Sequence, residues 1–254
     1  MVHLHYDYYA GDKSRTVIFL HGLFGSAKNF TTLAESITDV AETYALDARN
    51  HGRSPHTETH NLDDLVLDVK NFIGERSIKS PILIGHSMGG LTAMAYASEN
   101  PVRGLVILDI APRSYAPGHM QEIVAQKMDL SAFKTRQEID TKMAEILPNK
   151  TVRQFLQMNI NRVDEHFIWT NNIAAIERSQ ERTQFPNFKF PLYIGPVLGV
   201  RGLQSDYVTD TDVQLMHKAF PQLTMHDFAD ATHWLHHTHR AVLLQIIRSF
   251  LVKL

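Results

Sequence analysis

The stretch Ile82-Leu83-Ile84-Gly85-His86-Ser87-Met88-Gly89-Gly90 decides the fold of this chain of 254 residues. A short apolar run leads into Gly-His-Ser-Met-Gly, and an alanine-rich helical pattern follows at once. This is the G-x-S-x-G motif in the strand–turn–helix context that a nucleophilic serine requires. Gly85 and Gly89 make room for the neighbouring backbone, so that Ser87 projects its hydroxyl into open space. We interpret Ser87 as a nucleophile; the alternative is a tight or phosphate-binding turn in which Ser87 caps the helix.

Apolar runs of strand length recur on both sides of this motif and alternate with helical patterns. The runs are continuously apolar, which is typical of a parallel sheet covered on both faces. The predicted strands are residues 2–9, 16–20, 44–47, 105–110, 196–200 and 223–228. The predicted helices outside the middle of the chain are residues 29–39, 62–73, 210–220 and 239–252. We therefore expect an α/β fold with a mostly parallel central sheet flanked by helices.

The rhythm changes between about residues 113 and 190, where the pattern is mostly helical, rich in charge and without a convincing strand. This segment is either an inserted helical cap over the C-terminal edge of the sheet or a set of ordinary crossover helices. Its length far exceeds one crossover, which favours the cap. We expect residues 1–112 and 191–254 to form the core and residues 113–190 to form a helical cap, or lid.

Composition narrows the class of protein. The net charge is −2, which gives no indication of a nucleic-acid partner. The absence of cysteine excludes disulfides, thiolate metal sites and a cysteine nucleophile, and fits a reducing compartment. Residues 1–8 do not resemble a signal peptide, and no apolar run approaches the roughly 18 residues of a membrane span. We expect a soluble, cytoplasmic protein that acts on a small molecule; the oligomeric state is left open.

His233 is the candidate general base. A serine hydroxyl needs a base within hydrogen-bond reach, and such groups gather on loops at the C-terminal ends of strands. His233 follows the last predicted strand, where it would meet Ser87. The nearby His236, His237 and His239 raise the alternative of a metal site with His233. No carboxylate lies at helical spacing among them, and the acid and thiolate ligands typical of zinc sites are missing, so we expect no metal. The reaction of a serine nucleophile with a histidine base requires no cofactor, and we expect none.

Two carboxylates are candidates to orient this histidine. Asp109 ends the strand 105–108, and Asp206 follows the strand 197–200. A carboxylate after such an apolar run is costly to bury unless another group pairs with it. The alternatives are a turn or helix-capping role for Asp206 and a buried, hydrogen-bonding role for Asp109.

The oxyanion of a tetrahedral intermediate needs convergent backbone N–H donors. One should be Met88, which follows the nucleophile at the start of a helix. The other should come from the glycine-containing loop 21–25, and Leu23 is the best placed. This loop lacks the G-K-[ST] ending of a P-loop, which argues against nucleotide binding.

Taken together, the chain resembles α/β-hydrolase-fold enzymes along nearly its whole length, and within them the esterase group typified by bacterial YbfF. The order Ser87, acid, His233 is the order of that fold. The resemblance rests on the motifs at residues 21–26, 47–55, 85–90, 108–112 and 233–234. The cap segment matches loosely.

The resemblance implies roles for three further residues. In the YbfF-type group the acid that serves the histidine follows the strand after the elbow helix, which here is Asp109. A serine at the position of Ser205 is implied to join the catalytic network. This sequence departs from the group in having Asp206 directly after that serine, which keeps Asp206 as the alternative acid. A serine in the elbow also argues against haloalkane dehalogenases and epoxide hydrolases, which use an aspartate nucleophile.

The implied activity is hydrolysis of carboxylic esters, or of acyl thioesters, through an acyl-serine intermediate. One alternative is a carbon–carbon bond hydrolase that uses the same triad on ring-fission products. A perhydrolase-like activity is a variant of the same site. An alternative outside enzymology is a catalytically silent fold that serves as a binding module.

Overall fold

The apolar runs form the centre of the molecule as predicted. The computed structural model describes residues 1–116, 118–179 and 191–254. Its main sheet has seven strands in the order β1-β3-β2-β4-β5-β8-β9. The strands are β1 (Tyr6–Tyr9), β2 (Thr16–Leu20), β3 (Glu42–Leu46), β4 (Ile82–His86), β5 (Gly104–Leu108), β8 (Val197–Gly202) and β9 (Leu223–Phe228). Only β1 runs antiparallel to its neighbour, so the predicted, mostly parallel sheet is confirmed.

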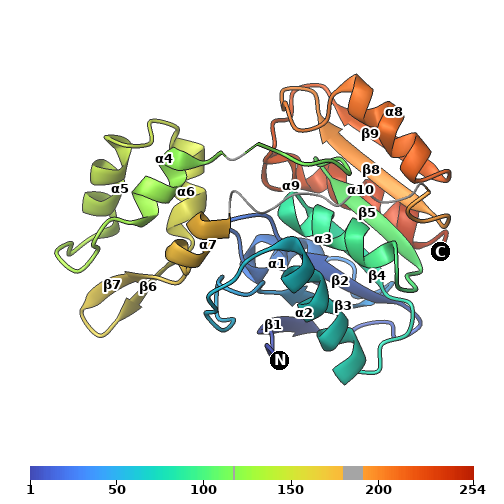
Figure 1. Cartoon of the computed structure of the whole chain (residues 1–254), viewed down its shortest axis with the longest axis horizontal. Helices are drawn as coiled ribbons and strands as arrows, with labels where there is room; N and C mark the ends of the chain where they lie inside the picture. Colours follow the sequence, from blue (N-terminus) through green and yellow to red (C-terminus); the bar gives the residue numbers. More distant parts are fainter. Residues whose placement is uncertain (117, 180–190) are drawn as a thin grey trace.

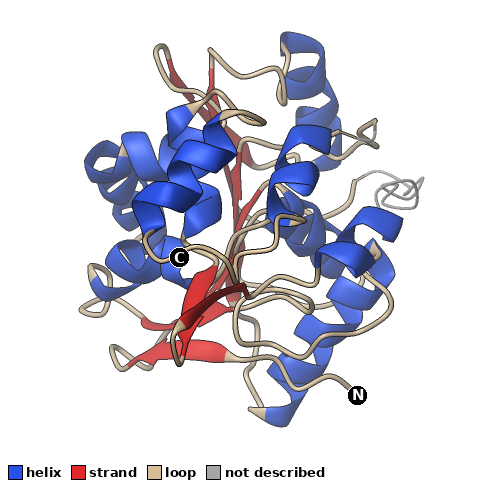
Figure 2. Ribbon diagram, turned by 90° about the vertical axis from the view of Figure 1, so that its left-hand side faces the viewer, coloured by secondary structure: helices blue, strands red, loops and turns tan. Residues whose placement is uncertain are grey.

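Helices cover both faces of this sheet (Figure 2). They are η1 (Ala27–Phe30), α1 (Thr31–Glu35), α2 (Leu62–Glu75), α3 (Met88–Ala97), α8 (Asp210–Ala219), α9 (Leu235–Thr238) and α10 (Arg240–Leu251). One core cluster joins the sheet to α2, α3 and α8 through Phe72, Met94 and Met216. A second joins it to α1 and α10 through Leu33 and Ile247. The two buried layers explain why the central strands β2, β4, β5 and β8 are buried along nearly their whole length.

The chain between β5 and β8 adds a group of elements beside the sheet (Figure 1). They are α4 (Met120–Gln126), α5 (Arg136–Ala144), α6 (Lys150–Gln157), β6 (Ile160–Val163), β7 (His166–Trp169) and α7 (Ile173–Ser179). Their apolar side chains form a third cluster, which also includes Phe24 from the loop after β2. The predicted boundary at residue 190 lies outside the described residues.

One expectation for this segment is wrong, because it contains two strands. β6 and β7 pair antiparallel, with Ile160 opposite Trp169 and Val163 opposite His166. The two-residue turn between them contains Asp164 at a φ of 52°. Aspartate tolerates this left-handed conformation, which tight hairpin turns need. Each strand has only four residues, too few for the alternating pattern to stand out in the sequence.

None of the helices in the described ranges combines the length and the apolar character needed to cross a bilayer.

Candidate active site

Ser87 lies at the turn between β4 and α3, with φ of 51° and ψ of −119°. Few non-glycine residues adopt such a backbone conformation, and those that do are often functional. The two glycines of the motif allow it through close packing. A Cβ on Gly85 would lie 2.3 Å from the carbonyl oxygen of Gly89, and a Cβ on Gly89 would lie 2.1 Å from that of Leu20. The turn therefore holds Ser87 at the C-terminal edge of the sheet.

Asp109 and His233 meet at the same edge. Asp109 directly follows β5 and is fully buried, while His233 lies in the loop after β9. The Nδ1 of His233 is 2.8 Å from Oδ2 of Asp109. The other carboxylate oxygen, Oδ1, accepts a hydrogen bond of 3.0 Å from the backbone N–H of Gly202. The buried carboxylate is thus fully paired, as its burial requires.

Ser205 is hydrogen-bonded to the Asp109–His233 pair, whereas the described residues show no such bond for Asp206. The hydroxyl of Ser205 donates a short hydrogen bond of 2.5 Å to Oδ2 of Asp109. Asp206 instead lines a pocket, and the described part of the chain shows no ion pair or hydrogen bond between it and His233. The structure therefore brings Asp109, Ser205 and His233 together, and leaves Asp206 outside this group.

The loop after β2 and the start of α3 present two free donors. Within the part of the chain that the structure describes, the N–H groups of Leu23 and Met88 have no hydrogen-bond acceptor. The next N–H, that of Phe24, is already engaged, because it donates to Nε2 of His51 at 3.1 Å. Leu23 and Met88 both line the pocket that Ser87 lines. Such a pair of donors is suited to an oxyanion.

Two buried histidines hold this loop in place, and sequence reasoning assigned them no role. Nδ1 of His21 donates to the carbonyl of Gly22 at 2.8 Å, and its Nε2 accepts from the N–H of Ala48 at 2.9 Å. Likewise, Nδ1 of His51 donates to the carbonyl of Arg49, and its Nε2 accepts from the N–H of Phe24. Burial lowers the pKa of both imidazoles, which keeps one nitrogen of each ring as an acceptor. The sequence feature that could have pointed to His21 and His51 is their place inside the glycine-containing motifs at residues 21–26 and 47–55.

His86, the residue before Ser87, is a further residue to which sequence reasoning assigned no role. Its Nε2 donates to the backbone carbonyl of His233 at 2.9 Å. Burial lowers the pKa of His86 well below its usual value, with smaller contributions from His236 and His233. A neutral His86 therefore anchors the backbone of the loop that carries His233.

The histidines considered above as metal ligands have separate partners. His236 is buried against His86, with ring centroids 4.1 Å apart, and Nε2 of His239 lies 3.1 Å from Asp230. Within residues 1–116, 118–179 and 191–254, no three histidine or acidic side chains converge as a metal site would require.

Ser87 borders two cavities of different size. The larger has a volume of about 420 Å³, within the range of small-molecule sites, and its walls include Leu65 and Leu91. The smaller has about 20 Å³ and is lined by His233 and by Phe155 of α6. The segment between β5 and β8 thus supplies part of the wall around Ser87.

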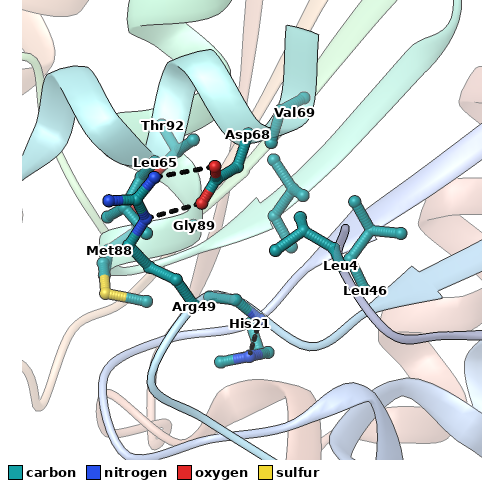
Figure 3. Close-up of a pocket in the computed structure, with 12 residues that line it drawn as sticks. Leu4, His21, Leu46, Arg49, Leu65, Asp68, Val69, Met88, Gly89 and Thr92 are labelled. Atoms are coloured by element: carbon teal, nitrogen blue, oxygen red, sulfur yellow. Dashed lines mark hydrogen bonds and ion pairs between the residues drawn. The ribbon is translucent and has the colours of Figure 1, made fainter. Parts of the chain in front are cut away.

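A further small interior cavity lies next to the first turn of α3 (Figure 3). At about 20 Å³ it has room for one water molecule. Arg49 and Asp68 of α2 form a buried, two-pronged ion pair at its wall, with N–O distances of 2.6 and 2.7 Å. This pair ties the loop 47–55 to α2, and the same loop contacts His21 through Ala48. The cavity is therefore part of the support beneath the site.

Comparisons with known proteins show the family to which this fold belongs. A family profile described as the alpha/beta hydrolase fold matches residues 15–240. The chain is similar to the sn-1-specific diacylglycerol lipase ABHD11 of Danio rerio, with 34% identity over 92% of this chain and 78% of that protein. It is 31% identical to the esterase YbfF of Escherichia coli, over 92% of each chain. A solved structure of a marine microorganism esterase superposes with a TM-score of 0.92 at 33% identity, covering 98% of this chain and all of the other.

Proposed function

The chain belongs to the α/β-hydrolase-fold family, and from this premise we propose that it is a serine hydrolase that cleaves carboxylic esters or acyl thioesters. Ser87 is the nucleophile, His233 the general base and Asp109 the acid that orients it. The N–H groups of Leu23 and Met88 hold the oxyanion. The observation that carries the proposal is the buried Asp109–His233 pair, 2.8 Å apart, whose histidine lines the same cavity as Ser87.

The proposed reaction has two halves. Oγ of Ser87 attacks the acyl carbon while Nε2 of His233 takes the hydroxyl proton, and the carbonyl oxygen becomes an oxyanion. The carbon–oxygen or carbon–sulfur bond then breaks, and His233 returns the proton to the leaving alcohol or thiol. Water repeats the cycle on the acyl-serine, which releases the acid. The described residues show no hydrogen bond between Ser87 and His233; such contacts often tighten only when substrate binds.

The names of the relatives support an ester as the bond that reacts. The Danio rerio and Escherichia coli relatives are a lipase and an esterase. A relative from Saccharomyces cerevisiae, 31% identical over 86% of this chain and 72% of that protein, is named a probable alcohol acetyltransferase. Each of these names describes chemistry at an acyl–oxygen bond.

The proposal includes a cap role for residues 113–190. His119 lies just before α4, and Val152 and Phe155 belong to α6; all three border the cavities at Ser87. A cap that supplies such walls selects substrates by the space left around the nucleophile.

The test combines a fluorophosphonate probe with a panel of p-nitrophenyl esters, acyl thioesters and ring-fission diketones. Wild type should be labelled once, at Ser87, and should hydrolyse esters or thioesters. Ser87→Ala should lose the label and nearly all turnover, whereas Ser98→Ala, at the far end of α3, should keep both. Absence of labelling and turnover in wild type would refute the proposal. Turnover of the diketones alone would favour a carbon–carbon bond hydrolase.

A further inference from the structure

Tyr207 covers the ring of His233 in a geometry that stands apart from the other ring contacts of this histidine. The two ring centroids are 3.7 Å apart and the planes differ by only 13°. The rings of His86 and Trp234 lie 4.6 and 5.8 Å away and are inclined by 42° and 70°. The phenol face of Tyr207 is therefore stacked on the imidazole.

The backbone of Tyr207 is fixed to the acid side of the site. Its N–H donates to the hydroxyl oxygen of Ser205 at 3.3 Å, and the same hydroxyl donates to Asp109. Its carbonyl accepts a hydrogen bond of 2.8 Å from the hydroxyl of Tyr115. Tyr207 thus contacts His233 through its ring and is linked to Asp109 through Ser205.

The hydroxyl of Tyr207 is held from the inserted segment. It lies 3.1 Å from Nε2 of His119, and Nδ1 of His119 is 3.8 Å from Glu122 on α4. The neighbouring imidazole of His119 is the main cause of the lowered pKa of Glu122. Burial raises the pKa of Tyr207, so its neutral hydroxyl is available to donate to His119. The tyrosine ring is therefore anchored at both ends.

On this basis, and assuming the function proposed above, we propose that Tyr207 is a positioning residue for His233. Its ring blocks rotation of the imidazole away from Asp109. It also presents a π face to the imidazolium that forms when Nε2 takes the proton of Ser87, and such a face attracts a cation. The attraction is stronger for the charged ring than for the neutral one, so it favours the transition state over the ground state.

Two substitutions separate the ring from the hydroxyl. Tyr207→Leu removes the π face and should lower kcat about tenfold, with little change in KM. A cation–π stabilisation of about 0.5–2 kcal/mol corresponds to a roughly 2- to 30-fold change in rate. Tyr207→Phe keeps the face and should retain kcat close to wild type. The matched control is Tyr193→Leu, which should keep wild-type kinetics. Tyr193 is also a partly buried tyrosine, but it lines neither cavity at Ser87.

The outcomes separate this inference from the proposed function. A raised KM with unchanged kcat in Tyr207→Leu would mean that Tyr207 only forms part of the pocket wall. An equal loss of kcat in Tyr207→Phe would assign the effect to the hydroxyl. Either result would overturn the inference, while the proposed function would stand as long as Ser87 still reacts with the fluorophosphonate. Pre-steady-state bursts should show that both acylation and deacylation slow in Tyr207→Leu, because His233 serves both steps. A measurement on wild type guards against a variant that does not fold. The Hε1 proton resonance of His233, assigned by its loss in His233→Gln, should be shifted upfield by the stacked ring, and an unshifted resonance would contradict the stack.

Discussion

At the scale of single residues, the site depends on one fully buried carboxylate with three hydrogen-bond donors. Oδ2 of Asp109 faces both His233 and Ser205, and Oδ1 faces the backbone of Gly202. Removing one donor leaves the others in place, but changing the acceptor affects all three. Asp109 is therefore the residue on which the orientation of His233 depends most directly.

Replacing each candidate acid by its amide tests this assignment. Asp109→Asn should lower kcat by a factor on the order of 10⁴, because an amide in this position favours the wrong histidine tautomer. Asp206→Asn is the matched control, since the described residues show no hydrogen bond or ion pair between Asp206 and His233, and its kcat should stay close to wild type. Steady-state kinetics on one p-nitrophenyl ester is sufficient. Equal small losses in both variants would contradict the role given to Asp109.

The positions of residues were predictable where a motif carries them. Ser87, Asp109 and His233 each follow a strand, so the common edge of a parallel sheet was enough to expect them together, and Asp109 and His233 do lie in contact. Tyr207 and His119 are separated by 88 positions, and no spacing rule connects them. Their contact depends on how the inserted segment packs on the loop after β8.

At the scale of elements, the junction of β2, β4 and α3 allows almost no added volume. The positions of Gly85 and Gly89 are filled by neighbouring carbonyl groups, which belong to backbone and cannot rotate away. The turn at Ser87 is therefore a product of close packing between elements as well as of its own sequence.

Two glycine-to-alanine changes measure that constraint. Gly89→Ala places a Cβ 2.1 Å from the carbonyl of Leu20 and should lower the free energy of unfolding by about 3 kcal/mol or more. Gly74 lies in α2 with open space around it. Gly74→Ala should raise the free energy of unfolding by roughly 0.5–1 kcal/mol, because alanine favours a helix more than glycine does. Urea unfolding gives both values. Similar effects in the two variants would show that the junction can relax.

The central strands of the main sheet could be predicted from the sequence and the hairpin β6–β7 could not. The difference lies in how many residues of each strand are buried. β2 has the bounds that its apolar run predicted, because a buried strand requires such a run. β9 also has its predicted bounds, although only Phe228 of this edge strand is buried. In β6 only Ile160 is buried, and in β7 only Phe167 is. One buried residue in each strand gives no periodicity to detect.

At the scale of the whole molecule, several imidazoles are buried as neutral groups. Those of His21, His51, His60, His86 and His236 are all almost inaccessible to solvent. Burial lowers the pKa of His60 and of His236 to about 3. In an unfolded chain a histidine binds its proton near pH 6.5. The unfolded state therefore binds more protons than the folded state at every pH between these values.

Stability should consequently fall as the solution is acidified. The contribution of His60 and His236 is complete above about pH 6.5 and is lost progressively toward pH 3, at about 1.4 kcal/mol per pH unit for each residue. Urea unfolding between about pH 7 and pH 5 measures this slope. His236→Phe should make it shallower by about one histidine's share, whereas His237→Phe, at an exposed position, should leave it unchanged. An identical slope in His236→Phe and wild type would refute the argument.

The pairing of β5 with β8 has a consequence for how the chain folds. These neighbouring strands are joined through the whole of residues 109–196, so their contact closes a long loop. The entropy of such closure grows only with the logarithm of loop length, about 0.6 kcal/mol for each doubling. Insertions or deletions in this segment therefore change the closure cost of the sheet little. The hairpin β6–β7 and the α5–α6 pair depend on near neighbours in sequence, so they can form early, while the β5–β8 contact is expected to be among the slow steps.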